Sequence, residues 1–86
     1  MARRARVPCR VRLGLHHMVS VRCVTPSRLA EILEEKDRPK SERSTGCWIV
    51  DDATIYINST LSLEEKWKTY LHELLHAIHD ILCMLA

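Results

Sequence analysis

The sequence LEEKWKTYLHELLHAIHDILCMLA, residues 63–86, decides the fold class of this chain. It contains no Gly or Pro, and its apolar residues recur every three or four positions, which is the period of a helix with one buried face. Directly before it, Ser62 and Glu65 have the spacing of a capping box, with Ser62 as the N-cap residue and Glu65 reaching back to its backbone N–H. We therefore predict one long helix from Leu63 to the last residue, with Trp67 and Leu71 shielded from solvent. Its predicted core-facing arc comprises Leu63, Trp67, Tyr70, Leu71, Leu74, Leu75, Ile78, Ile81, Leu82 and Leu85.

The middle of this predicted helix carries the motif HExxH, spelled His72-Glu73-Leu74-Leu75-His76. Residues four apart lie on the same side of a helix, so His72 and His76 can direct imidazole nitrogens at one metal ion while Glu73 lies beside them. Two His ligands and a Glu that takes a proton from water form the zinc-peptidase arrangement. The predicted apolar arc lies roughly opposite the two His, so we favour a zinc site with Glu73 as general base over a merely solvated helix face.

The length and composition of the chain predict one small domain spanning residues 1–86. No apolar run approaches the ~20 residues of a membrane span, and the basic N-terminus lacks the apolar segment of a signal peptide. The four cysteines have no CxxC spacing and predict free thiols in a reducing cytoplasm rather than disulfides or a Cys-based zinc site. These cysteines are Cys9, Cys23, Cys47 and Cys83.

Charge is distributed unevenly along the chain. Residues 1–30 contain seven Arg and no acidic residue, whereas residues 31–86 contain six Lys or Arg and eleven Asp or Glu. Such a basic segment could contact nucleic acid or an acidic protein. No aromatic residue alternates with these arginines to stack on bases, so we favour a solvated, flexible arm over residues 1–6.

Two pairs of β-rich stretches precede the long helix. Residues 7–15 and 18–24 alternate between apolar and polar positions and predict a hairpin that turns at Gly14. Thr25 followed by Pro26 predicts an N-cap and the first turn of a short helix to about Lys36, and residues 37–45 predict a polar loop. Residues 48–50 and 54–57 predict two further strands. The order strand-strand-helix-strand-strand-helix predicts an α+β fold, in which an antiparallel or mixed sheet packs on the long helix.

Three segments together resemble a known family. They are Thr54-Ile55-Tyr56-Ile57-Asn58, then Leu61-Ser62-Leu63-Glu64-Glu65-Lys66, then Tyr70-Leu71-His72-Glu73-Leu74-Leu75-His76-Ala77-Ile78. Over roughly residues 46–81 the chain resembles the small zincin metallopeptidases of bacteriophages and prophages, of the ImmA/IrrE or minimal gluzincin type. The resemblance implies that His72 and His76 bind Zn²⁺, that Glu73 is the general base, and that the protein acts in the bacterial host cytoplasm or in the virion. It also implies that the strand Thr54-Ile55-Tyr56-Ile57 lies at the sheet edge above the metal, where a peptide or protein substrate can pair with it.

The chain departs from the gluzincin pattern at the third zinc ligand, because no Glu follows His76. The open candidates are Asp80, His79 or Cys83 after a local helix distortion, His16 or His17 from the predicted hairpin, and a residue of another subunit. His79 and Cys83 share the helix face of His72 and His76, but a helix rise of ~1.5 Å per residue separates His72 and His79 by ~10 Å.

Two other functions stay open beside the zinc metallopeptidase. One is a non-catalytic, zincin-like phage protein, such as a virion neck or tail component bound to other phage proteins, in which zinc is structural or vestigial. The second is an adaptor that binds nucleic acid through the N-terminal arginines. No membrane partner is expected.

Overall fold

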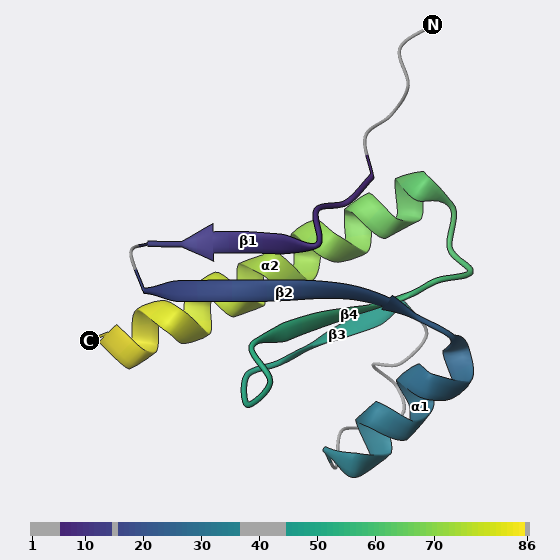
Figure 1. Ribbon diagram of the computed structural model, residues 1–86, viewed down its shortest axis with the longest axis horizontal. Coiled ribbons are helices and arrows are strands. Elements are labelled where there is room, and N and C mark those ends of the chain that lie inside the picture. The colour runs from purple at the N-terminus through teal and green to yellow at the C-terminus, as the bar shows by residue number, and fades with distance from the viewer. Residues whose placement is uncertain (1–5, 15, 37–44, 86) are drawn as a thin grey trace, which may run out of the picture.

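The structure, a computed structural model, describes residues 6–14, 16–36 and 45–85. Its elements are β1 (Arg10–Leu13), β2 (His17–Val24), α1 (Pro26–Glu35), β3 (Gly46–Ile49), β4 (Thr54–Asn58) and α2 (Leu63–Leu85) (Figure 1). The predicted α+β class and the predicted order of elements are confirmed. Of the predicted features, residues 1–5 of the basic arm, Leu15 of the hairpin and residues 37–44 of the polar loop lie outside the described residues. Neither helix in the described part of the chain is long and apolar enough to cross a membrane.

The four strands form one mixed sheet in the order β1-β2-β4-β3. β2 pairs with β1 in antiparallel and with β4 in parallel orientation, and β3 closes the sheet against β4 in antiparallel orientation. The prediction that Thr54-Ile55-Tyr56-Ile57 lies at the sheet edge is therefore wrong, because β4 is an interior strand and β3 is the edge. The physical reason is strand pairing: the chain returns through α1 so that β4 pairs with β2 in parallel orientation on one side and with β3 on the other.

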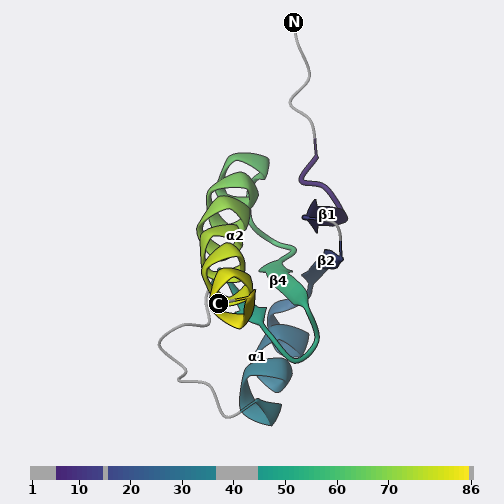
Figure 2. The ribbon, with the colours of Figure 1, turned by 90° about the vertical axis from the view of Figure 1, so that its left-hand side faces the viewer.

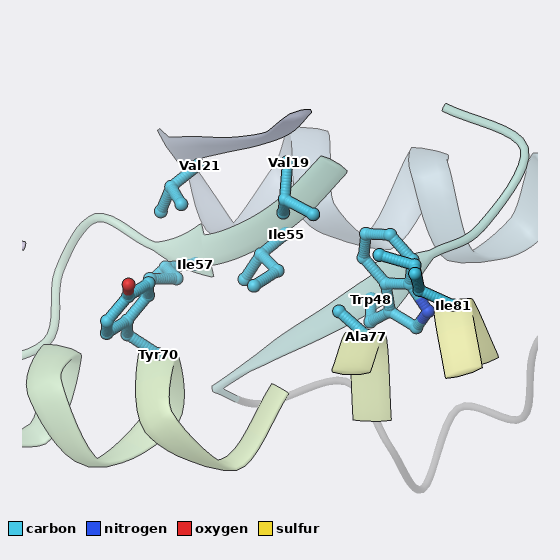
Figure 3. Close-up of a cluster of buried hydrophobic side chains, with 8 residues drawn as sticks. All are labelled: Val19, Val21, Trp48, Ile55, Ile57, Tyr70, Ala77 and Ile81. Carbon is cyan, nitrogen blue, oxygen red and sulfur yellow. The ribbon is translucent and has the colours of Figure 1, made fainter. Parts of the chain in front are cut away.

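The two helices pack on opposite faces of this sheet (Figure 2). α2 covers the face on which Trp48 lies, and α1 packs against the face that carries Cys47 and Ile49, because successive side chains of a strand point to opposite faces. The cluster beneath α2 is the larger core (Figure 3); it comprises Val19, Val21, Trp48, Ile55, Ile57, Tyr70, Ala77 and Ile81.

The predicted turns and helix starts are present. Gly14 has a φ of 78°, the left-handed conformation expected of it in the hairpin. Thr25 caps α1 by accepting a hydrogen bond from the Arg28 N–H at 3.2 Å on its Oγ1. Ser62 Oγ accepts a hydrogen bond from the Glu65 N–H at 3.2 Å, as an N-cap residue does. The Ser62 hydroxyl in turn donates to Glu65 Oε1 at 3.4 Å, so the Glu65 carboxylate meets the hydroxyl of Ser62 and not its backbone N–H as predicted.

The buried face of α2 is narrower than the predicted arc. Tyr70, Ala77 and Ile81 are buried, whereas Leu71 and Leu75 are 52% and 68% exposed. The prediction that Leu71 is shielded is wrong. Trp67 is only half-buried, with its ring edge-on to Tyr70 at 5.5 Å between centroids. A single sheet can cover only one stripe of a helix, so apolar residues beyond that stripe stay on the surface of this chain.

Candidate metal centre

His72 and His76 lie one turn apart on the exposed side of α2, and their imidazole rings converge. Their Nε2 atoms are 3.3 Å apart, and the ring planes meet at 78°. Two bonds of ~2.0–2.1 Å from zinc at a tetrahedral angle place the two nitrogens ~3.3–3.4 Å apart. Without a metal the same contact can be a hydrogen bond in which one imidazole donates its Nε2–H to the Nε2 of the other. The two side chains therefore already have the spacing of a pair of zinc ligands.

Glu73 follows His72 in the helix and lies on the flank of the His pair. Its side chain is 12% exposed, and its Oε2 atom is 3.9 Å from His72 Nε2. Because 100° of rotation separates neighbours on a helix, Glu73 turns away from the His face and towards the sheet. A carboxylate held beside the two imidazoles, without lying between them, is suited to accept a proton from a water molecule there.

The His pair borders a cleft of about 310 Å³ between α2 and the edge strand β3. α2 contributes His72, Glu73, His76 and Asp80 to the lining, and the chain entering and forming β3 contributes residues 45–48. The strand beside the candidate metal centre is therefore β3, and not Thr54-Ile55-Tyr56-Ile57 as predicted. In the sheet formed by the described residues β3 is the outermost strand, and an extended peptide could add a strand at such an edge.

Gly46 permits the close approach of β3 to α2. A Cβ atom at this position would lie 2.8 Å from Thr69 Cγ2 of α2, and it would also clash with the backbone carbonyl oxygen of Tyr56. Real Cβ atoms essentially never make contacts this short, so any larger residue would push the strand away from the helix or from β4. The sequence showed a glycine here, but nothing in it indicated that a helix packs on this backbone.

A hydrogen bond between Trp48 and Asp80 closes one side of the cleft. Trp48 is buried, and its Nε1 donates to Asp80 Oδ2 at 2.7 Å. The bond joins residues 32 positions apart and ties β3 to α2. The sequence predicted a strand at Trp48 but did not reveal this partner; the available signal was that a buried Trp N–H needs an acceptor.

The other candidate ligands are distributed over two places. His79 lies on the exposed face of α2, with its Nε2 3.7 Å from Cys83 Sγ. His16 and His17 border a separate hollow with Arg12 and Met18 at the hairpin, and the strand order puts that hairpin at the opposite edge of the sheet from β3. Over residues 6–14, 16–36 and 45–85, no three His, Cys, Asp or Glu side chains are grouped so that they could hold a metal ion. The assignment of Asp80 or His79 as a third ligand stays a prediction.

The arginines of the N-terminal third lie on a different part of the molecule. Arg10, Arg12 and Arg22 are exposed, and the pairing of β1 with β2 and of β2 with β4 puts them on the sheet face opposite α2. They do not border the His72–His76 cleft. A nucleic-acid-binding role for these residues stays a prediction that is independent of the metal centre.

Comparisons of the chain with protein-family models, with curated proteins and with solved structures find no match. The resemblance to phage zincins therefore rests on the residues of the motif and its surroundings. The geometry of the His72–His76 cleft is the physical basis for a function.

Proposed function

We propose that this chain is a zinc-dependent hydrolase of the peptidase class, with its active site in the cleft between α2 and β3. The observation that carries the proposal is the 3.3 Å separation of His72 Nε2 and His76 Nε2, with the Glu73 carboxylate beside them. Because the pair is formed by two residues of a continuous helix, their backbone positions are fixed one turn apart before any metal binds.

His72 and His76 would hold the ion through their Nε2 atoms. When bound, zinc supplies Lewis-acid chemistry that lowers the pKa of water and polarises a carbonyl group. Glu73 takes the proton from the attacking water and delivers it to the leaving nitrogen of the peptide bond. The edge of β3 aligns the substrate backbone along the cleft, and Asp80, held by Trp48, contributes negative charge to the cleft wall.

A second candidate function is a non-catalytic protein in which zinc is structural, such as a component of a phage virion. The specific observation in its favour is that the described residues bring no third ligand to His72 and His76. Two imidazoles alone bind zinc weakly, since structural sites close with four protein ligands. The two candidates differ in whether Glu73 performs chemistry.

The test compares purified wild type with Glu73→Gln and with a matched control, Glu64→Gln, in the first turn of the same helix. We expect about one zinc per chain in all three proteins by metal analysis, and loss of the metal in His72→Ala/His76→Ala. Glu73→Gln keeps the side-chain shape but cannot accept the proton, so its hydrolysis of an unstructured protein substrate should fall at least ~100-fold, whereas Glu64→Gln should stay at the wild-type rate.

Two results would contradict the peptidase. The first is zinc in the His72→Ala/His76→Ala protein at the wild-type stoichiometry. The second is equal hydrolysis by wild type and Glu73→Gln. Zinc binding that raises the melting temperature of wild type and Glu73→Gln equally, with no hydrolysis by either protein at any protein concentration, would support the structural candidate instead.

A further inference from the structure

Four metal-binding side chains follow one another along a single exposed face of α2. They are His72, His76, His79 and Cys83, with spacings of four, three and four residues. At ~100° per residue these positions fall within ~60° of one another around the helix axis. The HExxH motif accounts for the first two donors only.

These donors form two pairs, and each pair has the spacing of two ligands on one zinc ion. His72 Nε2 and His76 Nε2 are 3.3 Å apart, and His79 Nε2 and Cys83 Sγ are 3.7 Å apart. Tetrahedral zinc with bonds of ~2.0 Å to nitrogen and ~2.3 Å to sulfur requires ~3.3 Å for two nitrogens and ~3.6 Å for a nitrogen and a sulfur. Each pair therefore resembles one half of a four-ligand site.

One chain cannot combine its own two halves. The pairs are seven residues apart, which is ~10 Å along a helix, whereas the donors of one zinc ion lie within ~4 Å of one another. This distance agrees with the observation that the described residues contain no group of three possible ligands. Protein ligands that would complete a four-ligand site on either pair must therefore come from another molecule.

We propose that a second copy of this chain supplies it, in a two-fold dimer that binds two zinc ions. If two α2 helices lie antiparallel with the symmetry axis between residues 77 and 78, then His72 and His76 meet the partner's His79 and the partner's Cys83. The same axis brings His79 and Cys83 of the first chain to the partner's His72 and the partner's His76. One symmetric contact thus completes two sites, each with three nitrogens and one sulfur, and each thiol releases its proton to solvent when it binds.

The surface around the four donors suits a second copy. Leu75 and Leu82 are 68% and 61% exposed, and they lie only ~40–60° around the helix from His79. The acidic residues of this stretch, Glu73 and Asp80, border the cleft on one flank of the donor face, and Leu75 and Leu82 lie on the other flank, so the donor face has a carboxylate side and a leucine side. A stable interface usually buries ~800 Å² per partner, which is more than a few side chains provide, so the dimer should depend on the metal.

This proposal rests on the proposed zinc site and adds a regulation to it. In the monomer, zinc held by His72 and His76 keeps open positions, as a catalytic site does. In the dimer, protein ligands occupy all four positions, as in a structural site. Association of two chains would therefore switch hydrolysis off, and dilution into buffer with excess zinc would restore it.

The first measurement is the molar mass in reducing buffer, by sedimentation, with zinc and with a chelator. We expect a dimer with zinc and a monomer with the chelator. A zinc-loaded wild type that stays monomeric at ~100 µM, far above the Kd of a metal-closed contact, would overturn the dimer while leaving the proposed function intact. A wild type that binds no zinc at all would instead overturn the proposed function.

The second measurement is complementation between two variants, with Co²⁺ as a spectroscopic probe for zinc. One variant, His72→Ala/His76→Ala, keeps only the His79–Cys83 pair. The other, His79→Ala/Cys83→Ser, keeps only the His72–His76 pair. Neither variant alone should show the thiolate-to-cobalt charge-transfer band of a tetrahedral site, whereas their equimolar mixture should regain it at half the wild-type intensity per chain.

The matched control replaces the two other exposed cysteines, in the variant Cys9→Ser/Cys23→Ser, and should keep the full band. A mixture without the band, from variants that circular dichroism shows to be folded, would refute the trans arrangement. A full band in His72→Ala/His76→Ala alone would refute it as well, because that result would mean that the His79–Cys83 pair forms a site without the other pair.

Discussion

The hydrogen bond from Trp48 to Asp80 joins β3 to α2, and its removal should destabilise the whole domain. Trp48→Phe keeps an aromatic ring in the core but deletes the Nε1 donor that lies 2.7 Å from Asp80 Oδ2. A hydrogen bond to a charged group contributes ~1.5–3 kcal/mol, and its loss leaves a half-buried carboxylate without that donor. With some additional loss of packing, we expect the free energy of unfolding to fall by ~2–4 kcal/mol.

This loss would be large for so small a protein. At ~0.05–0.15 kcal/mol per residue, an 86-residue domain has a stability of ~4–13 kcal/mol. Each kcal/mol lowers the melting temperature of a domain of this size by ~4–8 °C. Trp48→Phe should therefore melt at least ~8 °C below wild type, on the same scale.

The assay is urea unfolding of Trp48→Phe, Asp80→Ala and the double variant, in chelator so that zinc linkage does not contribute. The fluorescence of Trp67 reports unfolding in all of them, because it is the second of the two tryptophans in the chain. If the bond contributes as we infer, the double variant loses ~1.5 kcal/mol less than the sum of the single variants. Losses that add to within ~0.5 kcal/mol would refute the reasoning, because residues that do not interact behave additively.

Three further outcomes are expected. Gly46→Ala should lower the free energy of unfolding, measured in urea, by ~1–3 kcal/mol, because the new Cβ would clash with the backbone carbonyl oxygen of Tyr56 and lie 2.8 Å from Thr69 Cγ2. Replacing Thr69 with Ser in the same chain removes only the second contact and should restore only part of that stability. Burial raises the pKa of Tyr70 above 10.0, so the stability it contributes is complete below that pH and is lost as the pH rises through the folded-state pKa. The free energy of unfolding of Tyr70→Phe should therefore fall less steeply with rising alkaline pH than that of wild type. Identical slopes of the unfolding free energy against pH would contradict a raised pKa for Tyr70. Leu75→Ser, at a 68% exposed position, should change the stability of the monomer, measured with a chelator present, by no more than ~0.5 kcal/mol. Ile55→Ala in the core should lower that stability by ~2–5 kcal/mol. Similar losses for the two variants would mean that the exposed face of α2 is covered in the monomer.

The elements themselves were determined by short stretches of sequence. The Thr25-Pro26 start of α1, the Ser62 cap of α2 and the turn at Gly14 each depend on one or two residues whose backbone preferences act locally. The approach of His72 and His76 was also determined locally, because the helix period alone puts residues four apart on one side. These features could be predicted because no distant part of the chain is needed to form them.

The tertiary structure alone decided how the elements meet. The alternation in Thr54-Ile55-Tyr56-Ile57 indicated a strand, but only the crossover through α1, which puts β4 beside β2, made it interior and left β3 at the edge. The period of α2 showed which residues are apolar but not how wide a stripe the sheet would cover, so Leu71 was expected inside and lies outside. The bond from Trp48 to Asp80 joins residues that only the packing of β3 against α2 brings together. Pairing and packing depend on contacts between residues far apart in the chain, and local periodicity carries no information about those contacts.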